Sequence, residues 1–514
     1  MKEVFTPVID LRRKVFAEIA RLAYEGGDYS RVENLPYKII PGEIATYRES
    51  IFLERAIVAE RLRLAMSLPL RTLKEHAPLS EGVNESAIGK KYFDPPLVNI
   101  IRFACHACAE NEVRVTDGCQ GCLAHPCKEV CPKGAISIVE RKSVIDQEKC
   151  IQCGLCTKVC PYHAIIQQKR PCAQACGMNA IHSDELGRAE IDQDRCVSCG
   201  MCISHCPFGA ISDKAQIFQL IQAMKEGDEV VAVVAPAFVN QFGPKVTAGK
   251  LKEGLKRLGF SDTAWVAMGA DLCTIDEAED FLKKVPAEQS FMATSCCPSW
   301  SMMAKMEFPE HADKVSMAMT PMVFTARWVK KQKPDCKVVF IGPCAAKKLE
   351  ASRQSVKSHV DFVLTFEEIM GMFEAKGLGP AELAKLPDNL DEDKDATAAG
   401  IGFPISGGVA GAVAEAIKRI APEREVLIEC ADGLDNCRKM LKLAAAGKKD
   451  GYLLEGMACP GGCVAGTGTL AKPDRAAVNV KKKMAAAEKQ NAMDSPISDE
   501  LHSLFETWFD EWEG

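Results

Sequence analysis

The sequence predicts an α/β C-terminal domain with mostly parallel sheets, preceded by small cysteine-rich α+β modules and a helical N-terminal region. Residues 1 to about 100 hold no cysteine and contain amphipathic helical stretches. Sixteen of the 25 cysteines lie between residues 105 and 206. Beyond Asp213, short apolar runs alternate with helical stretches, which is typical of buried parallel strands. These observations divide the chain into residues 1–100, 101–213, 214–490 and a helical tail at 491–514.

Each expected element rests on a local pattern. In the N-terminal region, residues 11–22 and 49–62 have helical periodicity, and their apolar faces serve either as core or as a docking surface for another subunit. In the C-terminal domain, buried strands are predicted at 230–235, 338–341 and 362–364. The charge-rich segment 386–396 is expected to be a solvated loop. The end of the chain, 481–512, combines a basic, alanine-rich helix with an acidic, aromatic one.

Composition narrows the classes of function. The chain has 514 residues, 47% of them hydrophobic, and a formal net charge of -6, so nothing suggests binding to nucleic acid or to an anionic membrane. The longest apolar run, about 230–239, is too short to span a bilayer. The charge makes a protein the expected partner. The N-terminal sequence resembles no signal peptide, so we expect a cytoplasmic protein.

The cysteines are spaced for metal rather than for disulfides. Their number is odd, and they cluster as Cys-x-x-Cys and Cys-x-x-x-Cys-Pro units. In a reducing compartment such spacing favours metal binding, with zinc ribbons as an alternative for the less regular pairs. Two runs fit the bacterial ferredoxin pattern Cys-x-x-Cys-x-x-Cys-x-x-x-Cys-Pro, which binds 4Fe-4S clusters. Their ligands are Cys150, Cys153, Cys156 and Cys160, and Cys196, Cys199, Cys202 and Cys206.

Eight less regular cysteines complete a set of sixteen, the number that four 4Fe-4S clusters require. In each regular run the fourth cysteine commonly ligates the other cluster of its pair. We expect the groups Cys119, Cys122, Cys127 with Cys160; Cys150, Cys153, Cys156 with Cys131; Cys105, Cys108, Cys172 with Cys206; and Cys196, Cys199, Cys202 with Cys176. Histidine can replace a thiolate at such clusters, but the count does not need the histidines among these loops: His106, His125, His163, His182 and His205.

Four further cysteines lie in three motifs of the C-terminal domain. These motifs are TSCCPSW at 294–300, PCAAKK at 343–348 and ACPGGC at 458–463. Cys297, Cys344, Cys459 and Cys463 are numerous enough to ligate a fifth cubane, although the first and last are far apart in sequence. Such a site would be assembled only by tertiary folding. An electron-transfer module followed by such a site indicates a redox metalloenzyme.

The three motifs together resemble those of the FeFe hydrogenases, and the resemblance covers residues 101 to about 480. It implies an H-cluster, which is a 4Fe-4S cubane joined to a diiron subsite that bears carbon monoxide, cyanide and a dithiolate amine. By this resemblance Cys297, Cys344, Cys459 and Cys463 bind the cubane, and Cys463 bridges to the diiron subsite. Soft thiolates suit iron and sulfur, and apolar surroundings leave the iron accessible to a small gas.

The same resemblance assigns residues around the cofactor. Lys347 matches a lysine that grips a cyanide ligand, Ala235, Pro236 and Ala237 match a loop at the other cyanide, and Met457 matches a methionine beside the diiron unit. Cys296 matches the thiol that passes protons to and from the dithiolate amine, a role open to a thiol that can lose and regain its proton. Glu277, Asp280 and Ser316 match the continuation of that proton path.

The chain also departs from the best-known members of this family. Gly342 stands where a methionine is common, Met322 where a glutamine often lies, and Ser299 where the first motif has glycine. These departures are expected to change packing and gas access at the site and suggest a less studied catalytic branch. Ordinary buried thiols are expected at the four unassigned cysteines, which are Cys273, Cys336, Cys430 and Cys437.

The resemblance implies an enzyme that interconverts protons and electrons with molecular hydrogen and exchanges electrons with ferredoxin or a similar low-potential carrier. The diiron subsite would depend on dedicated maturation proteins. An H-cluster-bearing sensor is an alternative, but the thiol Cys296 is present and no obvious signalling domain follows residue 480. A non-catalytic iron–sulfur assembly or electron-transfer protein is another, although the first motif is intact. A subunit of a larger complex, docked through the N-terminal region, also fits.

Overall fold

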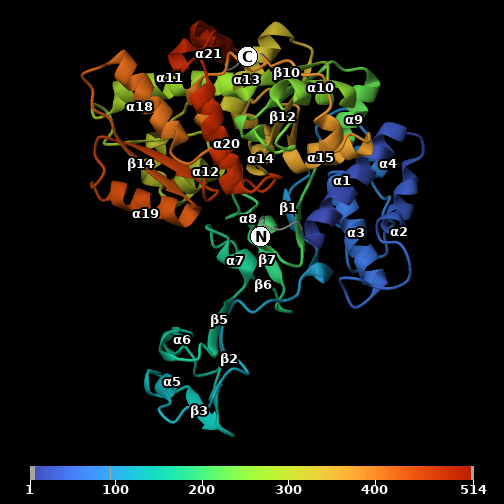
Figure 1. Cartoon of the computed structure of the whole chain (residues 1–514), viewed down its shortest axis with the longest axis vertical. Coiled ribbons are helices and arrows are strands. Elements are labelled where there is room, and N and C mark those ends of the chain that lie inside the picture. Colours follow the sequence, from blue (N-terminus) through green and yellow to red (C-terminus); the bar gives the residue numbers. More distant parts are fainter. Residues whose placement is uncertain (1–5, 93, 391, 511–514) are drawn as a thin grey trace.

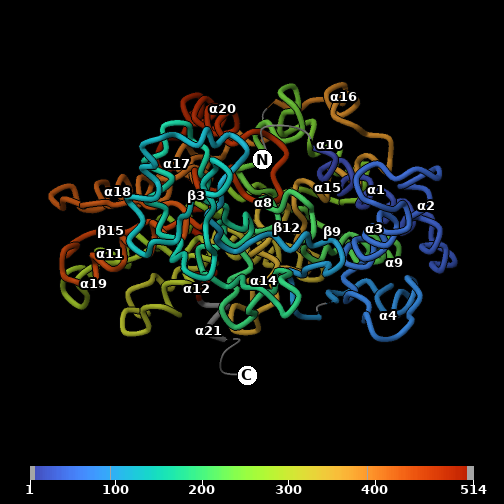
Figure 2. The backbone as a smooth tube through the Cα atoms, turned by 90° about the horizontal axis from the view of Figure 1, so that it is seen from below, coloured from blue at the N-terminus to red at the C-terminus, as the bar shows by residue number. Residues whose placement is uncertain are grey.

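The computed structural model describes residues 6–92, 94–390 and 392–510. A large body contains two parallel sheets and most of the helices, the N-terminal helices lie along one side of it, and a small module extends away from it (Figure 1). Seen from below, this module lies in front of the body, between the N-terminal helices and α18 and α19 (Figure 2). Among the described residues, no helix combines the length and apolarity needed to cross a membrane.

The N-terminal region is helical, as the periodicity predicts. Thr6 caps the first helix, since its hydroxyl oxygen accepts a hydrogen bond from the Ile9 amide. This helix packs on α15 so closely that a Cβ added at Gly371 would lie 2.5 Å from the Cβ of Phe16. Its apolar face is therefore core rather than a free docking surface. The helices of this region are α1 (Pro7–Glu25), α2 (Leu35–Ile39), α3 (Ile51–Ala65) and α4 (Val83–Ser86).

The cysteine-rich segment folds into short helices and two-stranded antiparallel sheets. The sheets pair β2 with β5, β3 with β4, β6 with β7, and β1 with β8, so residues just before position 101 join this segment. The strands are β1 (Val98–Ile100), β2 (Asn111–Val115), β3 (Ile136–Val139), β4 (Lys142–Ile145), β5 (Ile165–Lys169), β6 (Ile181–Ser183), β7 (Ala189–Ile191) and β8 (Ile211–Asp213). The helices are α5 (Pro126–Glu129), α6 (Leu155–Val159), α7 (Pro171–Gln174) and α8 (Met201–His205).

The body contains two sheets, and every strand pair in them is parallel, as predicted. The first has the order β10-β9-β12-β13 and the second β11-β15-β14. The three predicted buried strands are β9, β12 and β13. The strands are β9 (Val230–Val234), β10 (Asp262–Trp265), β11 (Met292–Ala293), β12 (Lys337–Gly342), β13 (Phe362–Thr365), β14 (Leu427–Asp432) and β15 (Tyr452–Met457).

Helices cover both sheets. The described part of the charge-rich segment 386–396 contains no helix or strand, as expected. The helices of the body are α9 (Ile217–Glu226), α10 (Ala248–Leu258), α11 (Val266–Lys284), α12 (Pro298–Glu307), α13 (Pro321–Gln332), α14 (Ala346–Ser352), α15 (Phe366–Ala375), α16 (Pro380–Leu383), α17 (Ala398–Gly402), α18 (Gly408–Ile420), α19 (Leu434–Ala445), α20 (Pro473–Ala486) and α21 (Leu501–Asp510).

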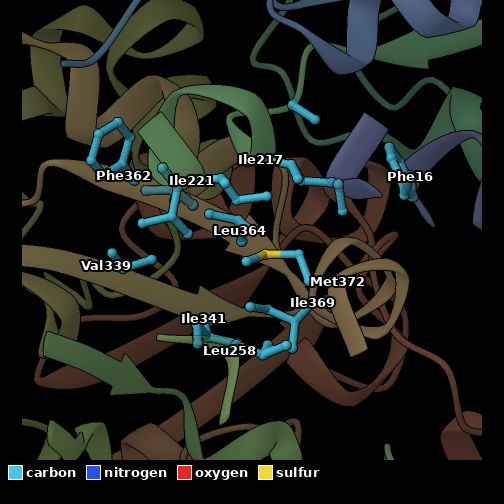
Figure 3. Close-up of a cluster of buried hydrophobic side chains, with 14 of the residues drawn as sticks. Phe16, Ile217, Ile221, Leu258, Val339, Ile341, Phe362, Leu364, Ile369 and Met372 are labelled. Atoms are coloured by element: carbon cyan, nitrogen blue, oxygen red, sulfur yellow. The ribbon is translucent and has the colours of Figure 1, made fainter. Parts of the chain in front are cut away.

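The largest core joins the N-terminal helices to the first sheet. Consecutive side chains along β12 and β13 are buried together with apolar side chains of α1, α9 and α15. Figure 3 shows part of this core: Phe16, Ile217, Ile221, Val339, Ile341, Phe362, Leu364, Ile369 and Met372.

One prediction about the cysteines is wrong. Cys273, Cys336 and Cys437 are buried, but Cys430 is exposed because β14 is an edge strand whose neighbours Leu427 and Ile428 are also exposed.

A buried ion cluster joins the cysteine-rich segment to the body. The Lys348 ammonium, 2% exposed, contacts Asp213 Oδ2 at 2.7 Å and Glu368 Oε1 at 2.6 Å, and donates to the Lys214 carbonyl at 2.8 Å. Asp213 ends β8, Lys348 lies on α14 and Glu368 on α15. Removing one member of such a cluster leaves charge buried without a partner, which costs about 3–5 kcal/mol.

We therefore predict that Lys348→Met lowers the free energy of unfolding by about 3–5 kcal/mol. The matched control is Lys14→Met, because Lys14 pairs with Asp10 at 2.8 Å while 52% exposed. An exposed pair contributes about 0–1 kcal/mol. Thermal and denaturant unfolding of both variants measures the difference, and equal losses for the two would refute a structural role of the buried cluster.

Candidate metal centre

The three cysteine motifs meet because they follow parallel strands. The first motif follows β11, the second follows β12 and the third follows β15, while Ala235 follows β9. Within each sheet the carboxyl ends of parallel strands open to the same side, so the loops after β9 and β12 converge, as do those after β11 and β15, and both sets of loops line one cavity. The structure thus brings together Cys297, Cys344, Cys459 and Cys463.

These four thiols are mutual neighbours. Cys459 lies within electrostatic range of Cys344, Cys463 and Cys297, and Cys463 lies within range of Cys297 and Cys344. Among the described residues, no three His, Cys, Asp or Glu side chains are arranged to hold one metal ion. A cubane needs no such convergence, because each thiolate binds a different iron.

A cavity of about 90 Å³ lies between the motifs. Every residue that the sequence assigns to the cofactor lines it, as does Cys296. Its other walls are almost wholly apolar and include Val266, Ala270, Met322 and Phe340. Soft thiols, one ammonium and apolar walls form a donor set that suits an iron–sulfur cofactor with small anionic ligands.

The ammonium of Lys347 is held at the cavity by a carboxylate. Its Nζ lies 2.6 Å from Glu350 Oε2 and donates to the Cys296 carbonyl at 3.3 Å. Thr320 Oγ1 donates to the other oxygen of Glu350 at 2.9 Å. Burial lowers the pKa of Lys347, but the Glu350 carboxylate and the neighbouring thiols outweigh it, so the pKa is raised overall and the side chain stays cationic.

Glu277 is fully buried beneath the first motif. Its Oε1 lies 2.9 Å from the Ser295 amide, which donates to it, and 3.1 Å from Ser295 Oγ. Ser295 Oγ also lies 2.9 Å from the Ala318 carbonyl, which can only accept. The single proton of the Ser295 hydroxyl is thus shared between the Glu277 carboxyl and the Ala318 carbonyl, and a protonated Glu277 could instead donate to Ser295 Oγ. Burial raises the pKa of Glu277 to about 8, so the carboxyl is protonated at neutral pH.

The rest of the predicted proton path is less closely joined. Asp280 is one helical turn from Glu277 on α11 and pairs with Lys284 at 2.7 Å near the surface. Ser316 Oγ accepts from the Ala318 amide at 3.1 Å. In the described part of the chain no hydrogen bond links Ser316 directly to Glu277 or Asp280. Ser316 is connected to Glu277 through Ala318 and Ser295.

Asp276 is an acidic neighbour that sequence reasoning missed. Burial raises its pKa to about 7, and the charges of Asp280 and Glu279 act in the same direction. Burial likewise raises the pKa of the Cys296 thiol. Ser295 was missed as well, because a serine inside the motif gives no sign that it will contact a carboxyl group 18 positions earlier.

The cysteine-rich segment touches this centre directly. Cys199 lines the cavity, and a Cβ added at Gly200, whose φ is +76°, would lie 3.3 Å from the Cβ of Ala345. Ser299 Oγ donates to the Val197 carbonyl at 3.1 Å. The serine that replaces glycine in the first motif therefore ties that motif to the loop between Cys196 and Cys199.

The cysteine-rich segment repeats one half-motif four times, namely Cys-x-x-x-Ala-Ile at residues 131–136, 160–165, 176–181 and 206–211. Each half-motif ends in an Ala-Ile pair, and the isoleucine begins a strand, namely β3, β5, β6 or β8. In every case the alanine amide donates to the sulfur of the cysteine four residues earlier, at 3.3 or 3.4 Å. The four bonds run from Ala135 to Cys131, Ala164 to Cys160, Ala180 to Cys176 and Ala210 to Cys206. Such bonds stabilise a thiolate and orient it.

Three of the four expected cysteine groups have all their members as electrostatic neighbours. Cys156 interacts with Cys150, Cys153 and Cys131. Cys202 interacts with Cys199, Cys196 and Cys176. Cys206 interacts with Cys108 and Cys172, which also interact with Cys105. In the fourth group, Cys127 lies 3.4 Å from the Ser143 hydroxyl, to which Cys119 also hydrogen-bonds.

Gly342 leaves room that a neighbouring ring fills. A Cβ at Gly342 would lie 2.5 Å from the Phe340 ring and 3.3 Å from the Cβ of Ala235. The two residues are two positions apart on β12, so they share one face of the strand. Phe340 lines the cavity and is 3% exposed. The loss of a methionine side chain at position 342 is thus compensated by an aromatic one from the same strand.

Comparisons with known proteins agree with this site. The family described as iron only hydrogenase large subunit, C-terminal domain, matches residues 228–467. The 4Fe-4S binding domain matches residues 143–166 and 189–212, which contain the two regular cysteine runs. The chain therefore carries an iron-only hydrogenase-like domain and iron–sulfur binding domains.

Several curated hydrogenases are similar over long stretches. The periplasmic [Fe] hydrogenase large subunit of Nitratidesulfovibrio vulgaris is 29% identical over 68% of this chain and 93% of that protein. Iron hydrogenase 1 of Clostridium pasteurianum is 27% identical over 79% of each chain. The NADP-reducing hydrogenase subunit HndD of Solidesulfovibrio fructosivorans is 29% identical over 49% of this chain, which spans only 52% of that subunit.

A relative with a different name is also similar. The cytosolic iron-sulfur assembly component 3 of Bos taurus is 27% identical over 46% of this chain and 59% of that protein. Sequence similarity of this extent therefore does not separate a hydrogenase from an assembly protein, and the residues of the cavity have to do so.

The packing at Gly342 gives a testable expectation. Gly342→Met should destabilise the protein by about 1–3 kcal/mol, because the new side chain overlaps the Phe340 ring. Phe340→Ala alone should cost about 3–5 kcal/mol through the cavity it leaves. The double variant should recover part of that loss, which a double-mutant cycle of denaturant unfolding measures. Strictly additive losses would contradict the proposed exchange of one side chain for the other.

Proposed function

We propose that this iron-only hydrogenase-like protein is an FeFe hydrogenase, which interconverts two protons and two electrons with molecular hydrogen. The observation that carries the proposal is the single apolar cavity at which four motif cysteines, the thiol of Cys296 and the ammonium of Lys347 meet. The proposed catalytic domain spans residues 214–490, after a helical region at 1–100 and an iron–sulfur domain at 101–213, and before a tail at 491–514.

In this proposal Cys297, Cys344, Cys459 and Cys463 hold the cubane of an H-cluster, with Cys463 as the bridge to the diiron subsite. When bound, the H-cluster supplies the redox and hydrogen-binding chemistry at iron. Lys347, Met457 and the loop of Ala235, Pro236 and Ala237 surround the small ligands of the diiron subsite. The apolar walls exclude water, which strengthens the electrostatic effect of Lys347 on cyanide.

The proposed proton path starts at Cys296 and continues through Glu277 to Asp280 near the surface. A protonated Glu277 suits a relay, because it can donate a proton and accept another. Ser295 joins the path through its contact with Glu277. Ser316 orients the Ala318 peptide and so acts on Ser295 from the other side.

The proposed electron path runs through four 4Fe-4S clusters held by the sixteen cysteines between 105 and 206. The cluster of Cys196, Cys199 and Cys202 would be next to the catalytic cavity, since Cys199 lines it. The cluster of Cys119, Cys122 and Cys127 would lie toward the outer end of the extended module, because α5, which carries Cys127, and β3 lie there (Figure 1). Electrons would thus enter or leave at the far end from the cavity.

The partner proposed for that end is an acidic low-potential electron carrier such as ferredoxin. Between residues 119 and 163 the sequence has six basic and four acidic side chains, in a chain whose net charge is -6. Exposed apolar side chains lie among them, including Leu123 at 95%, Ile151 at 56% and Tyr162 at 54%. An apolar patch with a basic surround suits transient docking of an acidic protein.

The alternatives make different demands on the cavity. An iron–sulfur assembly or electron-transfer protein has no need of a proton path, whereas Cys296 and the buried Glu277 form its first steps here. An H-cluster-bearing hydrogen or redox sensor would share the cofactor but not the turnover. The cytoplasm remains the proposed location, because a reducing compartment favours metal binding by sixteen clustered cysteines over disulfides. Maturation proteins would supply the diiron subsite. A further subunit could dock on the N-terminal region, but not on the face of α1 that packs against α15.

The experiment that tests this function is infrared spectroscopy of anaerobically matured protein, together with hydrogen evolution from a reduced dye. Bands of metal-bound carbonyl and cyanide with turnover are expected. Cys296→Ala and Glu277→Gln should keep the bands and lower turnover by about 100-fold or more, because each removes a proton-transfer step.

Two controls separate the proton path from general damage. Cys430→Ala removes an exposed thiol, and Glu279→Gln changes an exposed carboxylate two positions from Glu277. Both should keep full turnover. Bands without turnover in the unmodified protein would favour the sensor, and cubanes without any such bands after full maturation would favour the assembly or electron-transfer protein.

The docking proposal predicts the effect of reversing charge at the tip of the module. Lys142→Glu with Lys158→Glu should raise the KM for ferredoxin by about tenfold at low ionic strength, because both exposed lysines belong to the extended module and contribute to its positive charge. Turnover with a small dye should not change. Lys256→Glu on α10 is the matched control, and an equal effect of that variant would exclude the module as the docking site.

A further inference from the structure

A cavity of about 580 Å³ has no part in the proposed function. It lies where three regions meet: the start of α1 with α3, the loop that follows Cys206, and the segment 467–472 that leads to α20. Small-molecule sites commonly have volumes of about 300–1,000 Å³. The cavity is therefore of a size to hold a nucleotide rather than a single ion.

Basic side chains outnumber carboxylates on the walls of this cavity. Five basic side chains and three carboxylates line it. The basic side chains are Arg12, Arg13, Arg48, Arg61 and Lys472. Arg61 lies close enough to Arg12 and Arg48 for their charges to repel. Burial, together with that repulsion, lowers the pKa of Arg61 to about 10. Such a group of guanidinium ions is stabilised by a bound anion.

Two guanidinium groups have donors left over. Arg61 is 4% exposed and donates from Nη2 to the Gly209 carbonyl, but its buried Nε has no hydrogen-bond partner among the described residues. Arg12 pairs through Nη2 with Glu367 at 2.8 Å, and its Nε likewise has no partner within the described ranges. Buried donors are nearly always paired, so these two indicate a ligand that accepts hydrogen bonds.

The carboxylates do not neutralise these donors. Glu367 is already paired with Arg12, and Glu49 is exposed. Glu54 Oε1 accepts from the amides of Thr46 at 2.7 Å, Tyr47 and Arg48, which fixes the side chain. Its buried Oε2 has no partner in the described part of the chain. The cavity thus offers one acceptor beside several cationic donors, which suits an anion that also carries hydroxyl or amino groups.

Two further features favour phosphate as the anion. The first residues of α1, Thr6 to Ile9, line the cavity, so the positive end of a 19-residue helix faces it. Aromatic rings form another wall: His106 stacks on Phe208 with 4.3 Å between ring centroids, and the Arg48 guanidinium lies 5.5 Å from the Phe208 ring centroid. A phosphate at the helix end and a planar group near these rings would use both features.

The iron–sulfur cluster proposed at Cys206 is a competing explanation for the arginines, because a cluster with four thiolates is anionic. Arg61 does interact with Cys206. Cys206, however, forms only one wall of the cavity, and a cluster on its sulfur cannot fill a volume of about 580 Å³ bounded by α1 and residues 467–472. Part of the positive charge is available to another anion.

We propose that this cavity binds a phosphorylated organic ligand of nucleotide size, with its phosphate on Arg61 and Arg12 and a hydroxyl or amino group on Glu54. The ligand would contact α1, α3 and the segment before α20 at once, and it would lie beside the cluster of Cys206. This binding site does not depend on hydrogen turnover, so it can be tested whatever the fate of the proposed enzymatic function.

The test is isothermal titration of the cluster-loaded protein with ATP and, separately, with inorganic pyrophosphate, in magnesium-free buffer of low ionic strength. Saturable binding of ATP at one site is expected, at least tenfold tighter than that of pyrophosphate. Equal affinities would overturn the organic part of the proposal. The absence of saturable binding for both compounds would overturn the site and leave the cluster as the only anion that the arginines serve.

Variants connect the binding to this cavity. Arg61→Gln should weaken ATP binding at least tenfold, and so should Lys472→Glu, which changes an exposed side chain at the cavity and leaves the core intact. The matched control is Arg257→Gln, since Arg257 is exposed on α10 and pairs only with Glu253 at 3.2 Å. Unchanged affinity in both Arg61→Gln and Lys472→Glu would refute the assignment.

Discussion

The buried contact of Lys348 with Asp213 and Glu368 is the constraint on which the arrangement of this protein depends. It joins the last strand of the cysteine-rich segment to two helices of the body. Lys348 also follows Lys347 and lies four residues after Cys344, so the same short helix that meets the ion cluster carries residues of the cavity. Because buried charges tolerate little displacement, this contact fixes the second cysteine motif relative to the electron-transfer segment.

The close approach of that segment to the cavity follows from this constraint. Cys199 lines the cavity, Gly200 allows its backbone to approach Ala345, and Ser299 donates to the carbonyl of Val197. A side chain at position 200 would both clash and require an unfavourable backbone conformation. The contact is therefore built from small groups at short distance, which is what electron transfer between adjacent cofactors needs.

Much of the fold and of the centre could be predicted from the sequence, because their signals are local. Apolar runs identified β9, β12 and β13, and motif spacing identified the cysteines that the structure brings to one cavity. What could not be predicted depends on contacts between distant segments. Phe340 replaces a missing side chain at Gly342, Ser295 contacts Glu277, and the exposure of Cys430 follows from its place on an edge strand. None of these leaves a periodic or motif signal.

The two cavities differ in whether their buried cations already have partners within the protein. At the cavity between the cysteine motifs, Lys347 has Glu350 beside it, and Glu350 in turn accepts a hydrogen bond from Thr320. The positive charge of Lys347 is therefore balanced by Glu350 before a cofactor binds. Lys347 can contact an anionic ligand while Glu350 keeps its hydrogen bond from Thr320. At the cavity between α1 and α3, Arg61 and Arg12 keep buried donors without partners among the described residues. Since unpaired buried donors cost about 1–3 kcal/mol each, a fold that retains them gains stability when an anion enters.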